Sequence, residues 1–135
     1  MASELKVNTL TGVSTAGSIA VTGEGNSTTT NLQQGLLKHW VHFEGDSADL
    51  DAGQYDSFNT TSVTDNTTGD YDVNIVNDMA DVYYVIMAAG ATNRGVTIDT
   101  DTMTVGSYNL ECYRYADSSS QDSQHVMTGV AGDLA

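Results

Sequence analysis

The chain has 135 residues, of which 39% are hydrophobic, so it has room for one ordinary domain and a short extension. Its net charge of −14, from 18 acidic and 4 basic residues, repels nucleic acid and anionic membranes, and we expect neither as a partner. No apolar run is long enough for a signal peptide or a membrane-spanning helix. The single cysteine, Cys112, allows no internal disulfide, and its strand-like surroundings favour a buried, inert thiol.

Residues 1–29 differ in composition from a globular core. Apolar residues are scattered among Ser, Thr, Gly and Asn, and short strand-like pieces stand at Leu5–Val7 and Ser18–Thr22. One interpretation is a flexible tail. The other is an extended shaft, in which several copies of the segment wind together and attach the protein to a larger particle. The attachment residues would then be Leu5, Val7, Leu10, Ile19 and Val21.

Residues 30–38 have a pattern typical of a short helix. Thr30 is placed to cap it, with Gln33 completing a capping box. Three apolar residues then fall on one face at a spacing of four, with a fourth beside them. Because so short a helix does not persist alone, it must pack on the following domain or on copies of itself. The predicted trimer neck consists of Leu32, Leu36, Leu37 and Trp40.

From residue 39 to residue 135 the pattern is that of a β head domain. The clearest element is a hairpin within Asp56–Val76, because Tyr71, Val73 and Ile75 alternate with polar residues. Gly69 can take the positive φ that its turn requires. Phe58–Val63 is predicted to form the strand before the turn.

The other predicted strands follow at short intervals. In His39–Phe43, Val41 and Phe43 share one face, and Trp40 and His42 the other. Further strands are expected at Val82–Met87, covered on both faces, and at Gly95–Ile98, Met103–Val105, Tyr108–Tyr115 and His125–Gly129, whereas residues 130–135 continue no strand. The predicted fold is all-β, with an antiparallel sandwich-like head of about seven strands after an extended segment and one short helix.

No arrangement of residues is typical of an enzyme site. His39 and His42 cannot share a strand face, so they indicate solvated or interface histidines and not a zinc site. The acidic loop 44–54 contains Asp46, Asp49 and Asp51, which are candidate Ca²⁺ ligands; solvated turns are the alternative. We expect no other cofactor.

Several short motifs occur in a recognisable order. They are the opening Met1–Leu10, then SIAVTGEG at 18–25, LQQGL at 32–36, KHWVHF at 38–43, DSFN at 56–59, TDNTTGDY at 64–71 and VYY at 82–84. Together they resemble small tail-fibre or virion structural proteins of tailed bacteriophages, marine ones especially. The resemblance extends to about Met87, and the chain departs from it at His39, at His42 and in the acidic loop.

The resemblance implies a non-enzymatic, trimeric virion component, made in the host cytoplasm. Its N-terminus would bind other virion proteins, of the tail or of the capsid, and its β head would point outward. There it would contact a host-surface glycan or protein through many repeated weak contacts. The alternative is a free monomeric β-sandwich that binds a glycan or Ca²⁺. A small hydrolase would require a carboxylate pair in a cleft.

Overall fold

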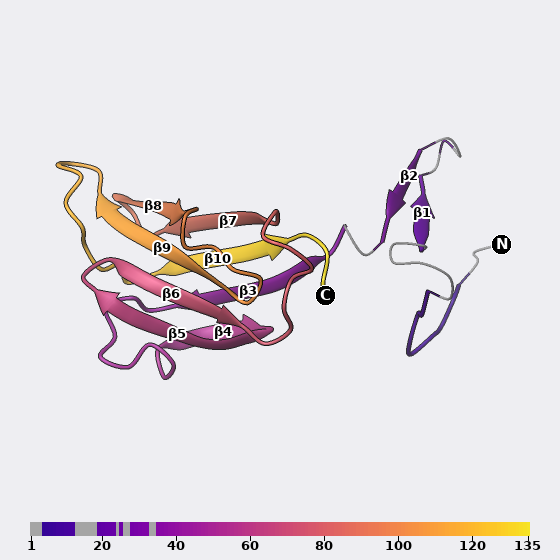
Figure 1. Ribbon diagram of the computed structural model, residues 1–135, viewed down its shortest axis with the longest axis horizontal. Helices are drawn as coiled ribbons and strands as arrows, with labels where there is room; N and C mark the ends of the chain where they lie inside the picture. The colour runs from indigo at the N-terminus through magenta and orange to yellow at the C-terminus, as the bar shows by residue number, and fades with distance from the viewer. Residues whose placement is uncertain (1–3, 13–18, 24, 26–27, 33–34) are drawn as a thin grey trace. The chain divides into compact units, whose positions relative to one another are not determined.

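The computed structural model describes residues 4–12, 19–23, 25, 28–32 and 35–135. These residues form strands, turns and loops and no helix. The strands are β1 (Ala20–Thr22), β2 (Thr29–Asn31), β3 (Leu37–Phe43), β4 (Gln54–Phe58), β5 (Thr60–Thr67), β6 (Asp70–Ile75), β7 (Val85–Gly90), β8 (Arg94–Asp99), β9 (Ser107–Arg114) and β10 (Val126–Ala131), as labelled in Figure 1.

The chain divides into two compact units, Met1–Leu36 and Leu37–Ala135. In the first unit, β1 and β2 form a two-stranded antiparallel sheet, and the amide of Leu32 continues it by donating to the carbonyl of Ile19 at 2.8 Å. Leu5–Val7 forms no strand, contrary to the prediction. The β-branched residues of β1 and β2 suit such a pairing, but a lone hairpin buries little apolar surface.

The second unit contains two four-stranded antiparallel sheets, with strand orders β4-β3-β10-β7 and β5-β6-β9-β8. Figure 1 shows the second sheet lying across the first. Apolar side chains from both sheets form one buried cluster, including Phe43 and Val126 from the first sheet and Tyr71, Val73 and Leu110 from the second. The predicted all-β antiparallel fold is confirmed, and the arrangement is sandwich-like.

The central hairpin is also confirmed. Strands β5 and β6 pair with Val63 opposite Val73, and Tyr71, Val73 and Ile75 all point into the core. Gly69 takes φ of 73° in the turn. The single strand predicted at Phe58–Val63 is wrong, however, because Phe58 ends β4 in one sheet and Thr60 begins β5 in the other.

The change of sheet occurs at Asn59, which adopts φ of 59°. Its side-chain amide donates to the carbonyl of Lys38 at 2.8 Å, and its Oδ1 accepts from the amide of Asn77 at 2.9 Å. Asparagine tolerates the left-handed region because its short side chain bonds to nearby backbone. Asn59 therefore fixes the corner at which the chain crosses between sheets.

The short helix predicted at 30–38 is wrong. Thr30 and Asn31 lie in β2, and Leu37 begins β3; Gln33 of the proposed capping box lies outside the described residues. β10 pairs along the whole of β3 and reaches Leu37 opposite Ala131. The β1–β2 pairing before Gly35 and the β3–β10 pairing after it provide the backbone groups with hydrogen bonds. These hydrogen bonds outweigh a weak local preference for a helix.

Three further predictions are wrong, at the edges of the fold and at the end of the chain. Residues 82–84 form no strand, and β7 begins at Val85 with alternate residues exposed, so this segment is not covered on both faces. Residues 103–105 also form no strand. Residues 130–135 are predicted to continue no strand, but Val130 and Ala131 belong to β10 and Leu134 makes a β-bridge with Met79.

His39 is buried in the core, contrary to the prediction from the sequence. The predicted faces of β3 are confirmed, with Val41 and Phe43 buried, but His39 shares their face and is fully buried. Its Nε2 lies 2.9 Å from the hydroxyl of Thr60, and its Nδ1 lies 3.2 Å from the hydroxyl of Tyr108. The expectation of a solvated or interface histidine is therefore wrong for His39, because buried hydroxyls satisfy both ring nitrogens.

Candidate interaction surface and loop-end pocket

The outer face of sheet β4-β3-β10-β7 is apolar. Residues paired across neighbouring strands share a face, and two rows run across β3, β10 and β7: His42, Met127 and Ala89 in one, and Trp40, Gly129 and Met87 in the next. Five large side chains on this face are between 39% and 61% exposed: Leu37, Phe58, Val85, Met87 and Met127. An exposed apolar area of this kind typically marks an interaction site.

A bulge brings Leu37 onto this face. Val130 pairs with His39, yet Ala131 pairs with Leu37, so one extra residue of β3 stands between the two pairs. The added residue shifts the alternation of side chains by one position. A Cβ at Gly129 would lie 3.8 Å from both terminal carbons of Leu37, so the leucine lies over this glycine beside Trp40. An open apolar groove of about 510 Å³ runs between Leu37, Trp40, Met87 and Met127.

The outer face of the opposite sheet has the reverse character. Its cross-strand pairs place Asp70 opposite Glu111, and Asn109 lies between Asp72 and Asp99 on the neighbouring strands. The side-chain amide of Asn109 donates to both Asp70 and Asp72. Like charges placed directly opposite each other destabilise a sheet, so this face is suited to water and not to a second acidic surface. The molecule therefore has one apolar and one acidic outer face.

The residues predicted to form a neck fall in both units. Leu37 and Trp40 lie on the apolar outer face. Leu32 and Leu36 belong to the first unit, where Leu32 is half-buried and Leu36 is exposed. The predicted attachment residues all lie in the first unit too: Leu5, Val7, Leu10 and Val21 are exposed and Ile19 is half-buried.

The acidic loop is held by its own hydrogen bonds. One oxygen of Asp49 accepts from the amides of Asp51 and Ala52, each at 3.2 Å, and one oxygen of Asp51 accepts from the amide of Val63 at 2.9 Å. Asp46 lies apart, on the wall of the pocket described next. Within the described parts of the chain, no group of three or more His, Cys, Asp or Glu side chains is arranged to hold a metal ion.

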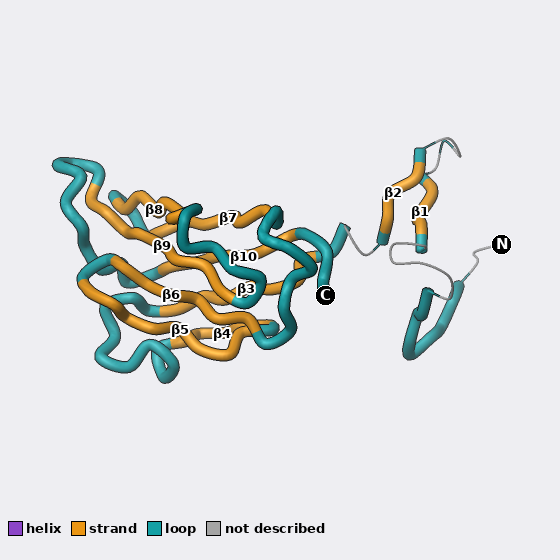
Figure 2. The backbone as a smooth tube through the Cα atoms, in the orientation of Figure 1, coloured by secondary structure: helices purple, strands orange, loops and turns teal. Residues whose placement is uncertain are grey.

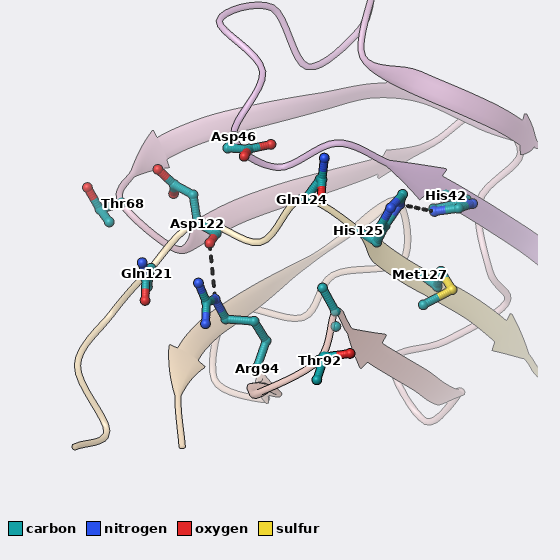
Figure 3. A pocket seen from close by; sticks show the side chains of 12 residues that line it. His42, Asp46, Thr68, Thr92, Arg94, Gln121, Asp122, Gln124, His125 and Met127 are labelled. Carbon is teal, nitrogen blue, oxygen red and sulfur yellow. Dashed lines mark hydrogen bonds between the residues drawn. The ribbon is translucent and has the colours of Figure 1, made fainter. Parts of the chain in front are cut away.

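An open pocket of about 1100 Å³ lies at one end of the sandwich (Figure 3). Its walls come from the 44–53 loop, the β5–β6 turn, the β7–β8 turn and residues 121–125, and Figure 2 shows these loops at the same end of the two sheets. Polar side chains converge on it: Thr92, Arg94, Gln121, Asp122, Gln124 and His125. The sequence prediction missed this pocket, because its residues are far apart along the chain and share no motif.

Two interactions at the pocket fix its walls. The Nε of Arg94 donates to the carbonyl of Asp122 at 3.3 Å, and the rings of His42 and His125 approach with Nε2 and Nδ1 3.1 Å apart. Figure 3 shows both as dashed lines. Tyr55 packs against both imidazoles, with ring centroids at 4.6 and 5.3 Å. Burial, with smaller contributions from Glu44 and Asp46, raises the pKa of Tyr55.

The buried titratable groups near the pocket are held in their neutral forms. Burial raises the pKa of Cys112 to about 11, which disfavours the nucleophilic thiolate. Burial first, and then the hydrogen bond to Asp122, raises the pKa of Tyr71. The hydroxyl of Tyr71 lies 3.0 Å from both Asp122 Oδ1 and the carbonyl of Gly45, so it ties the pocket floor to the core.

Comparison of the chain with protein-family models, with curated proteins and with solved structures finds no match. The residues that the structure describes include no helix long and apolar enough to cross a membrane. The physical arrangement of the molecule, with its apolar face, acidic face and loop-end pocket, is therefore the basis for the functional argument below.

Proposed function

We propose that the protein is a non-enzymatic structural protein of a tailed-phage virion surface, and that its β heads associate as a trimer through the apolar outer face. The observation that carries this proposal is the row of exposed large apolar side chains across sheet β4-β3-β10-β7. The trimeric state and the virion setting rest on the sequence resemblance, within which the protein is a short fibre of the tail or of the capsid.

The chemistry of the face favours a second copy of this chain as the occupant. Among its paired positions, the ionisable residues are His42 and Asp56, which lie together at one side. The row formed by Trp40, Gly129 and Met87 contains no charge that a partner would have to neutralise. Each copy presents the same uncharged surface, so three copies can meet around a threefold axis in a closed assembly without burying a charge there.

The area of the apolar outer face is that expected for the apolar core of a protein–protein interface. Four strands about 4.8 Å apart and about six residues long give a footprint of roughly 300 Å² in projection. A stable interface buries roughly 800 Å² on each partner, with an apolar core inside a polar rim. The apolar face supplies the apolar core, and the loops of the β head around it supply the polar rim.

The distribution of charge supports the same arrangement. With a net charge of −14, copies repel one another wherever their acidic faces meet. Association through the apolar face leaves Asp70, Asp72 and Glu111 pointing outward, where water and salt screen them. The exposed apolar residues of the first unit, among them Leu5, Leu10 and Val21, are then the surface that attaches each copy to the particle.

The test is the native mass of the purified chain by light scattering. The wild-type protein should have three times the 14.3 kDa mass of one chain. Met87→Lys places a charge in the row that Met87 forms with Gly129 and Trp40, and it should shift the mass towards the monomer, because a charge buried without a partner costs several kcal/mol. Thr97→Lys, on the acidic outer face opposite Glu111, is the matched control and should remain a trimer.

Both variants replace an exposed strand residue, so each should retain the β-sheet circular dichroism of the wild type. A wild-type protein that is monomeric at all concentrations would refute the assembly. The same conclusion would follow if Met87→Lys and Thr97→Lys formed equally stable trimers.

A further inference from the structure

The pocket at the loop end has polar groups of mixed character. Arg94 offers N–H donors, Asp122 offers carboxylate oxygens, and the amide of Gln124 and the hydroxyl of Thr92 each donate and accept. They come from the β7–β8 turn, from β8 and from residues 121–125, and they converge on one space (Figure 3). A concave site with a few convergent polar groups is the usual form of a small-molecule site.

The guanidinium of Arg94 is held in place by hydrogen bonds to the protein, which leave some of its N–H groups available to a ligand. Its Nε donates to the carbonyl of Asp122 and one Nη donates to the carbonyl of Asn93 at 3.4 Å. These bonds use two of the five N–H groups of a guanidinium. Both acceptors are backbone carbonyls, so no carboxylate neutralises the head group among the described residues. Arg94 can therefore donate to a ligand from a fixed position.

Asp122 is fixed in the same way. Its Oδ1 accepts from the amide of Gly69 at 2.6 Å and from the hydroxyl of Tyr71 at 3.0 Å. The other carboxylate oxygen accepts no hydrogen bond from the described residues and remains available as an acceptor. An anchored carboxylate beside an anchored guanidinium gives a donor and an acceptor at a set separation, which is what orients a ligand bearing neighbouring hydroxyl groups.

An unsatisfied hydrogen-bond acceptor on Gln121 is a second, independent observation in favour of a ligand in this pocket. Its Oε1 is buried and has no hydrogen-bond partner within the described structure. A buried acceptor without a donor destabilises a folded protein, and such groups are rare. Because Gln121 lines the pocket, rotation of its side-chain amide would allow Oε1 to accept a hydrogen bond from a bound donor.

The charges around the pocket select against ions. Asp46 and Asp122 line the same space, and with the total charge of −14 they repel anionic ligands in spite of Arg94. Arg94 in turn repels metal cations, and the described residues offer no metal-ligating group of three. What remains is an uncharged molecule whose own groups both donate and accept hydrogen bonds.

One wall of the pocket is aromatic. The imidazole of His125 lines it, and the ring of Tyr55 packs against His125 with the two planes tilted by 31°. A flat ring beside polar groups can pack against the apolar C–H face of a sugar ring while its hydroxyls reach the opposite wall. We propose that this pocket binds a neutral, polyhydroxylated ligand, namely a sugar residue of an uncharged glycan. The proposal is independent of the trimer, because every wall belongs to one chain.

The experiment is a titration of the ¹⁵N-labelled protein, followed by amide chemical shifts. The probes are methyl glucoside, methyl galactoside, methyl mannoside and N-acetylglucosamine, with sialic acid as the anionic probe and glycerol as a polyol without a ring. At least one neutral sugar should give saturable shifts at Thr92, Arg94 and Gln124, and sialic acid and glycerol should give none.

Two variants test the residues. Arg94→Gln should weaken the binding of that sugar roughly tenfold or more, because one charge-assisted hydrogen bond contributes about 1.5–3 kcal/mol. Glu111→Gln removes a charge on the acidic outer face and should leave the affinity unchanged.

The proposal is overturned if no neutral sugar in the panel gives a saturable shift. It is also overturned if sialic acid is preferred to the neutral sugars, or if Arg94→Gln retains the wild-type affinity while folded.

Discussion

His39 makes the stability of the fold depend on pH in a way that can be calculated. The ring is fully buried, and burial lowers its pKa from 6.5 to about 4. In the unfolded chain the imidazole takes up a proton near pH 6.5, whereas in the folded protein it stays neutral until about pH 4. The unfolded state therefore binds more protons between these values, and the free energy of unfolding falls as the pH is lowered.

The magnitude follows from the two pKa values. The contribution is fully present above pH 6.5, declines by about 1.4 kcal/mol per pH unit below it, and levels off under pH 4. At pH 5 the loss attributable to His39 is about 2 kcal/mol. This is a large fraction of the 5–15 kcal/mol or so that stabilises a typical domain.

The assay is urea denaturation between pH 8 and pH 5 of the wild type and of His39→Gln. The glutamine side chain introduced by this substitution is uncharged at every pH but keeps polar atoms near Thr60 and Tyr108, the two hydrogen-bond partners of the imidazole. The carboxylates titrate alike in both proteins, so the difference between the two pH profiles isolates His39. Between pH 8 and pH 5 the wild type should lose about 2 kcal/mol more than the variant.

Thr60→Val is the control, because it removes a hydrogen bond to His39 but leaves an imidazole that can still be protonated. It removes the hydroxyl that lies 2.9 Å from His39 Nε2 and should lower the stability by about 1–3 kcal/mol at every pH. Its pH profile should keep the wild-type slope. Parallel profiles for the wild type and His39→Gln would refute the claim that a neutral, buried imidazole controls acid stability.

Three further predictions concern the second sheet and its neighbours. Gly69→Ala should destabilise the fold by about 2 kcal/mol or more, measured by urea denaturation, because φ is 73° and the new Cβ would lie 2.9 Å from the amide of Gln121. Glu111→Gln should raise the stability by roughly 0.5 kcal/mol in dilute buffer and by less in 1 M salt, because it removes a charge opposite Asp70 and salt screens that repulsion; an equal gain at both salt concentrations would contradict this account. Cys112 should not react with a thiol reagent at pH 8 until the protein unfolds, since it is buried and its pKa is raised to about 11.

Local patterns in the sequence predicted what local physics determines. The alternation of Tyr71, Val73 and Ile75 and the turn at Gly69 specify the β5–β6 hairpin, because both the pleat and the turn act over a few residues. The outward position of Trp40 and the burial of Val41 and Phe43 follow from the same period.

Features that depend on distant partners were not predictable in this way. His39 is buried because Tyr108, 69 positions later, supplies a hydroxyl, and the helix expected at 30–38 is replaced by strands because β10 pairs with Leu37. The apolar outer face combines residues of four strands whose order cannot be derived from their spacing along the chain. For β7, the exposed alternate residues Val85 and Met87 give a continuous apolar sequence that is typical of a strand covered on both sides, although only one side is covered within a single chain.

The apolar outer face and the loop-end pocket are adjacent. His42 and Met127 line both the apolar groove and the pocket. Association through the face would order these two side chains, and His42 is linked by a 3.1 Å contact to His125 on the pocket wall. If the two proposals hold, association and sugar binding are coupled, and the coupling must be the same in both directions. Each copy would also carry its own pocket, so three weak sites would act together on a surface with repeated glycans. The coupling is measured by comparing the affinity of the Met87→Lys monomer for a single sugar with that of the wild-type trimer. A monovalent probe gains nothing from the presence of three sites, so multivalency does not contribute to the difference.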